Sequence, residues 1–65
     1  MEKIKVQEDK RTYIYADGTE FAIERVVEFA MPGTTHRLTT NDGVHYIIAP
    51  GWIAIRIDGI DDWAV

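Results

Sequence analysis

The chain has 65 residues, no cysteine and a formal net charge of −4, and 46% of its residues are hydrophobic. This length predicts one domain over residues 1–65, and the missing cysteine excludes disulfides and cysteine-ligated zinc as its support. Because a core of this size is marginal, we expect the chain to form a homo-oligomer.

Charge is distributed unevenly along the sequence. Residues 1–11 carry a net charge of +1, whereas residues 12–65 contain three arginines and eight acidic residues. Backbone binding to nucleic acid needs clustered Lys and Arg, so this balance argues against a nucleic-acid partner. There is no apolar leader after Met1 and no segment long enough to span a membrane, so we expect a cytoplasmic protein without a membrane partner.

The N-terminal part predicts two short strands. Lys3–Val6 alternates polar and apolar residues, Gln7–Arg11 is entirely polar and indicates a turn or loop, and Thr12–Tyr15 is rich in β-forming residues. Ala16-Asp17-Gly18 follows. An Asp-Gly pair between apolar runs is a strong hairpin signal, because both residues tolerate the dihedral angles of a tight turn.

Residues 20–30 allow two interpretations. With a period of two they form a long bent strand whose apolar face is interrupted by Arg25. With a period of 3.6 they form a helix with an acidic stripe, capped by Thr19 and ended by Pro32-Gly33. The β-branched and aromatic content favours the strand, and an α+β fold with a helix at 20–30 is the alternative.

A second hairpin is predicted around Asn41-Asp42-Gly43, between Thr35–Thr40 and Val44–Ala49. Three-residue loops in both hairpins, each with its glycine in the left-handed region, place the large apolar side chains on one face. A two-residue loop would mix polar and apolar residues, so we prefer the longer loop. The predicted core face comprises Tyr13, Tyr15, Phe21, Ile23, Leu38, Val44, Tyr46 and Ile48.

Pro50-Gly51 then forms a corner before a last strand, Trp52–Ile57, with Ile53, Ile55 and Ile57 on one side, and an acidic tail at 58–65. The corner within Tyr46–Ile53 resembles that of SH3-like small barrels, a likeness of architecture that covers roughly residues 12–57. The predicted fold is all-β: a five- to six-stranded antiparallel SH3-like barrel or a strongly bent sheet. Such a fold by itself implies no function.

No group of residues predicts catalysis. Serine and cysteine, the commonest nucleophiles, are both absent. The predicted register points His36 to the core side and His45 outward, which argues against a shared catalytic or metal site. Asp58, Asp61 and Asp62 lie too close together for a calcium loop. We therefore expect no enzyme, no catalytic residues, no metal and no cofactor.

Exposed apolar residues predict binding instead. Trp63 lies in a polar tail and needs a surface to pack on, Trp52 lies beside the Pro-Gly corner, and Ile47 points away from the predicted core. Asp61 and Asp62 would form a polar rim. We predict a small non-enzymatic interaction protein that binds and masks a protein partner, such as an inhibitor of a basic partner, and acts as a homo-oligomer.

Two alternatives use other residues. In the first, an oligomer captures a small anionic ligand between subunits with Arg25, Arg37 and Arg56, because Arg25 interrupts an apolar strand face and needs a partner. In the second, a nucleic-acid-binding small barrel stacks bases on its tyrosines, which the acidic body argues against.

Overall fold

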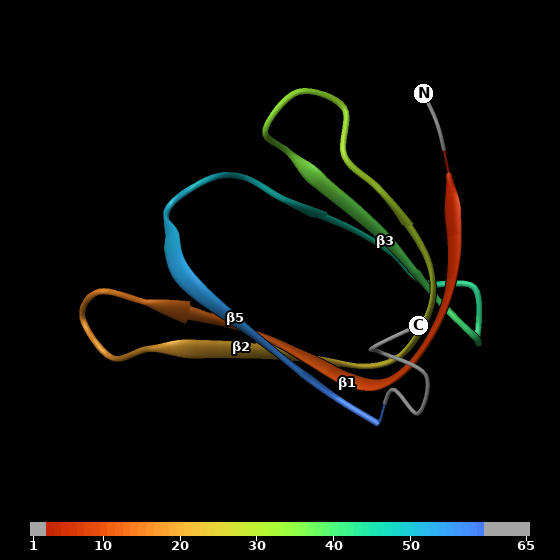
Figure 1. The fold of residues 1–65 in the computed structure, drawn as a ribbon, viewed down its shortest axis with the longest axis horizontal. Coiled ribbons are helices and arrows are strands. Elements are labelled where there is room, and N and C mark those ends of the chain that lie inside the picture. The colour runs from red at the N-terminus through yellow and green to blue at the C-terminus, as the bar shows by residue number, and fades with distance from the viewer. Residues whose placement is uncertain (1–2, 60–65) are drawn as a thin grey trace.

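The computed structural model describes residues 3–59 of the chain. They form one five-stranded antiparallel sheet in the order β4-β3-β2-β1-β5 (Figure 1). The predicted all-β class is confirmed, and the helix considered for residues 20–30 is wrong. Within the described residues no helix is long and apolar enough to cross a membrane. The strands are β1 Ile4–Tyr15, β2 Glu20–Ala30, β3 His36–Thr40, β4 His45–Ile48 and β5 Trp52–Asp58.

The sheet is open, which corrects the expected SH3-like barrel and the strongly bent sheet. β4 and β5 are its two edges, and they do not pair with each other (Figure 1). The link between them holds Pro50, which has no backbone N–H, and Gly51, whose φ is 145°. Since β4 is also only four residues long, the chain passes from one edge to the other without closing a ladder.

Both hairpins have the predicted register. The Tyr15 amide donates to the Thr19 carbonyl over 2.9 Å, and the Thr40 amide donates to the Val44 carbonyl over 2.9 Å. The glycine of each three-residue loop has a positive φ, 90° in the first and 86° in the second. The predicted cross-strand pairs are observed: Tyr13 with Phe21, Leu38 with Tyr46, and His36 with Ile48.

β1 runs without interruption through the segment predicted as a loop. It spans 12 residues, and Gln7–Arg11 lies inside it, so that prediction is wrong. Both Glu8 and Arg11 are buried, although residues three apart on a regular strand point to opposite faces. A polar stretch therefore forms a strand here because an irregularity turns two of its charged residues inward.

β2 has a matching irregularity. Ile23 and Val26 are both buried, and between them Arg25 has a φ of 55°, which is rare for a residue with a side chain. The register between the strands is unchanged across this point, with Glu8 opposite Val26 and Arg11 opposite Ile23. Each strand thus has one extra residue between these two pairs. The extra residues reverse the face to which the following side chains point, while the same residues of the two strands stay opposite each other.

The core lies on one face of the sheet, called the inner face below. It contains Val26, which the sequence pattern missed, because the irregularity at Arg25 turns Val26 inward and leaves Val27 37% exposed. Phe21 and Val44 were expected in the core but are 43% and 42% exposed near the hairpin loops. The buried apolar cluster comprises Tyr13, Ile23, Val26, Leu38 and Ile48, with Val6, Tyr15, Phe29, Tyr46, Trp52 and Ile55 packed against it.

The inner face is concave. β3 and β5 are separated in the sheet by β2 and β1, yet the rings of His36 and Trp52 lie 4.9 Å apart.

On β5, Ile55 lies opposite Tyr13, whereas Ile53 falls at a register shift and is 67% exposed. The expectation that Ile53 shares a side with Ile55 is therefore corrected.

Candidate functional site

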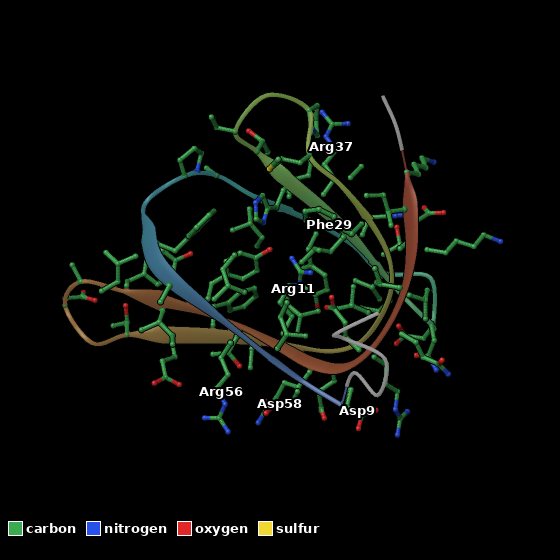
Figure 2. All side chains as sticks on the ribbon, in the orientation of Figure 1. Asp9, Arg11, Phe29, Arg37, Arg56 and Asp58 are labelled. Atoms are coloured by element: carbon green, nitrogen blue, oxygen red, sulfur yellow. The ribbon has the colours of Figure 1, made fainter. Side chains whose placement is uncertain are left out.

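The inner face holds a buried ion pair. The Arg11 guanidinium donates through Nε and Nη2 to the two carboxylate oxygens of Glu8, over 2.8 and 2.6 Å. The side chains of Arg11 and Glu8 are only 7% and 1% exposed. The Arg11 Cζ also lies 4.6 Å from the centre of the Phe29 ring, and Figure 2 shows both side chains pointing into the concave side. Such a two-pronged pair fixes geometry as well as charge.

A second polar contact lies beside this pair. The Tyr13 hydroxyl and His36 Nδ1 are 2.8 Å apart. Burial, reinforced by the charge of Arg11, lowers the pKa of His36, and burial raises the pKa of Tyr13. His36 is therefore neutral and Tyr13 protonated near neutral pH, so this hydrogen bond joins two uncharged groups.

Aromatic rings enclose the histidine. His36 meets Trp52 at 4.9 Å and Phe29 at 5.0 Å between ring centres, the latter edge to face. With Glu8, Arg11 and Tyr13, these rings form what we call the inner cluster: Glu8, Arg11, Tyr13, Phe29, His36 and Trp52. Its charged groups are bonded to one another and shielded from water, so the cluster is suited to holding the sheet in shape rather than to meeting a substrate.

The two histidines lie on opposite faces, as predicted. His36 is buried on the inner face, and His45 is exposed, with its Nδ1 3.0 Å from the Thr39 hydroxyl. Among residues 3–59 no three His, Cys, Asp or Glu side chains are placed to hold a metal ion.

The other face, called the outer face, presents charges in rows across the strands. Lys10 lies between Glu24 on β2 and Asp58 on β5, and in the next row Thr12 lies between Ala22 and Arg56. Opposite charges on neighbouring strands stabilise a sheet modestly. This part of the outer face is thus compatible with contact with water.

The two edge strands carry the most exposed large apolar residues of the described chain. Ile47 on β4 and Ile53 on β5 are each 67% exposed. An edge strand presents unpaired N–H and C=O groups that can pair with another chain. β5 is the longer edge, with seven residues against four in β4.

The predicted partner-binding residues have different surroundings. Ile47 is exposed on an edge, in agreement with its predicted outward direction. Trp52 is half-buried in the inner cluster, where it packs on Tyr13 and His36. Asp61, Asp62 and Trp63 lie outside the described residues.

The three arginines proposed to share an anion are not brought together. Arg37 lies opposite Ala30 near one end of β2, whereas Arg56 lies across β1 from Ala22 near the other end. Figure 2 shows Arg37 and Arg56 far apart on the molecule. Arg25 is the positive-φ residue of the β2 irregularity, and its carbonyl accepts a hydrogen bond from the Asn41 amide over 2.9 Å. A single site made by all three is therefore not formed within one chain.

A shallow pocket of about 230 Å³ lies at the end of the sheet where β2, β3 and β4 meet the start of β1. Arg37, the second residue of β3, lines the pocket and lies between the buried residues His36 and Leu38, so it belongs to the outer face. The polar and apolar side chains that line it include Lys3, Glu28, Arg37, Thr39, His45 and Ile47.

No family model, curated protein or solved structure is similar to this chain.

Proposed function

We propose that this chain is a small interaction protein without catalytic activity, which binds polypeptide at the open edge of β5, and that a second copy of the chain occupies this edge. The observation that carries the proposal is the length of β5, seven residues, which pair with β1 on one side only. Antiparallel addition of a strand to such an edge satisfies backbone donors and acceptors on both chains.

β5 lacks most of the features that protect natural edge strands. It contains no proline, and its register shift lies near its start, at Ile53, so the residues after it form a regular edge. Protective edges are short, carry proline or are interrupted by bulges. β4 is protected in this sense, because it is short and is followed by Pro50.

Charge complementarity supports a second copy as the occupant. Arg56 and Asp58 are two residues apart and share the outer face, 3.4 Å from each other. In an antiparallel pair of β5 strands centred on Ile57, Arg56 of each copy lies directly opposite Asp58 of the other. Registers centred on Arg56 or Asp58 would oppose like charges, which disfavours them. Symmetric pairing of this kind uses the same patch on both subunits.

A protein partner with an exposed strand would be masked by the same backbone pairing. Asp61, Asp62 and Trp63 follow β5 in the sequence after Gly59 and Ile60, and we retain Trp63 as the anchor of such an interface and Asp61 and Asp62 as its polar rim. The absence of catalysis is supported by the inner cluster, whose Glu8, Arg11, Tyr13 and His36 groups bond to one another.

A charge-swap series tests the proposal. Sedimentation velocity over a micromolar dilution series should show a weak dimer for the natural chain, because a single strand pair buries little surface. Arg56→Asp and Asp58→Arg, each alone, should shift the population toward monomer, and the double variant should restore the dimer. Glu20→Arg on β2, an exposed charge reversal opposite the uncharged Ile14, is the control and should leave association unchanged.

A monomer at every concentration would overturn self-association through this edge. Loss of dimer in both single variants without recovery in the double variant would overturn the proposed register. Unfolding of a variant is excluded by far-UV circular dichroism before each measurement.

A further inference from the structure

We propose that the outer-face pocket at the β4 end of the sheet binds a small monocarboxylate that carries an apolar body. This site is separate from the β5 edge and does not depend on the proposed self-association. β4 and β5 are at opposite edges of the sheet, so the two sites can be tested independently.

Cross-strand pairing assembles the polar part of the pocket. Directly opposite residues share a face. One row across the strands joins Lys5, Glu28, Thr39 and His45, and the next row joins Ala30, Arg37 and Ile47. Ala30 is only 4% exposed and its small side chain leaves room between its neighbours. The pocket is thus a hollow over Ala30 with polar groups around it.

Arg37 is the group best placed to hold an anion. It is exposed, and within residues 3–59 it makes no ion pair, although the protein as a whole is acidic. A guanidinium presents two parallel N–H donors that match a carboxylate. The Thr39 hydroxyl and the His45 ring, 3.0 Å apart, lie in the neighbouring row.

The charge balance of the pocket favours one negative charge on the ligand. Lys3 and Arg37 supply two positive charges, and the Glu28 carboxylate lies 3.9 Å from the Lys3 ammonium. Glu28 therefore neutralises most of the contribution of Lys3 and leaves Arg37 uncompensated. A doubly charged phosphate would meet about twice the repulsion from Glu28 that a monocarboxylate meets, so the single charge is favoured.

The apolar body is indicated by the remaining lining. Ile47 is 67% exposed beside Arg37, and the methyl group of Ala30 lies in the same row. Phe29, Leu38 and Tyr46 also line the pocket, but their side chains belong to the inner face. A volume of about 230 Å³ is below that of pockets for drug-sized ligands, so the body is a single ring or a short branched chain. Phenylacetate has this size and charge and serves as the probe.

Binding is measured by amide chemical shifts in two-dimensional NMR during titration with phenylacetate. We expect saturable shifts at residues around the pocket, such as Ala30 and Ile47, and at least tenfold weaker binding by the Arg37→Gln variant. Lys10→Gln removes an exposed cation of the same face, on β1 and outside the pocket, and should bind like the natural chain. Benzyl alcohol, which lacks the charge, and inorganic phosphate, which lacks the apolar body, should each bind at least tenfold more weakly.

Several results would overturn the proposal. Shifts that do not saturate, or equal affinity of Arg37→Gln and the natural chain, would remove the site. Equal binding of phosphate would reduce it to a nonspecific cationic patch, and equal binding of benzyl alcohol would reduce it to an apolar one.

A carboxylate at the end of a peptide is distinguished from a free acid by titration with a short peptide ending in phenylalanine and with its amidated form. Tighter binding of the peptide acid than of phenylacetate indicates a peptide ligand, and the reverse indicates a free acid.

Discussion

Removal of one partner of the Glu8–Arg11 ion pair should cost a large share of the stability of the protein. Glu8→Gln keeps the shape of the side chain but leaves the guanidinium of Arg11, whose side chain is 7% exposed, without its counter-charge. Breaking a buried pair costs about 3–5 kcal/mol, because one charge remains buried and uncompensated. A chain of this length has a total stability of about 3–10 kcal/mol, so the loss is a large share of it.

The matched control is Glu28→Gln, the same substitution in an exposed pair. Glu28 lies 3.9 Å from Lys3, and their side chains are 30% and 62% exposed. Solvent screening limits such a pair to less than about 1 kcal/mol. Urea unfolding followed by far-UV circular dichroism measures the free energy of unfolding of both variants.

Arg11→Met completes a double-mutant cycle with Glu8→Gln. We expect the double variant to lose less free energy of unfolding than the sum of the two single losses, by about 2 kcal/mol or more. The reason is that the second substitution removes the buried charge that the first leaves without a partner. If Glu8→Gln costs no more than Glu28→Gln, or if the two single losses simply add, the ion pair does not stabilise the fold in the way described.

Two further predictions concern pH and backbone geometry. Burial lowers the pKa of His36, so the unfolded chain binds a proton at a higher pH than the folded chain does. The free energy of unfolding should therefore fall as the pH drops below about 6.5. Urea unfolding at about pH 7 and about pH 5 should show this fall in the natural chain and in His45→Gln but not in His36→Gln, and equal slopes in both variants would refute it. Gly59 has a φ of 85°, and a side chain there would overlap the Asp9 carboxylate. Gly59→Ala should therefore lower the melting temperature more than Gly18→Ala, whose φ is 90° in open space, and equal losses would contradict the overlap.

The hairpins were predictable because their determinants are local. Asp17-Gly18 and Asp42-Gly43 locate the two turns, and the apolar alternation of the strands selects the three-residue loop. The loop length then specifies which residues face each other. The register predicted from the sequence is confirmed in both hairpins. The opposite directions of His36 and His45 follow from that register.

The irregular part of β1 and β2 could not be predicted from alternation. Arg25 was visible as a misfit in an apolar strand, but its meaning depends on a matching extra residue in β1. Glu8 and Arg11 resemble a polar loop in sequence, and only their pairing makes burial tolerable. Closure of the sheet was also overestimated, since a Pro-Gly corner indicates a change of direction and says nothing about whether the strands on either side pair.

The matched extra residues of β1 and β2 constrain how the length of this hairpin can change. Deleting Arg25 alone would shift the register of β2 against β1 by one residue on one side of the deletion. The side chains of β2 on that side would then point to the opposite face of the sheet. Deleting one residue from β1 between Glu8 and Arg11 would do the same to β1. Removal of both would keep the two strands aligned, although Glu8 would then point to the outer face. Between Glu8 and Arg11 on β1, and between Ile23 and Val26 on β2, we therefore expect tolerated insertions and deletions to come in pairs, one on each strand at the same level.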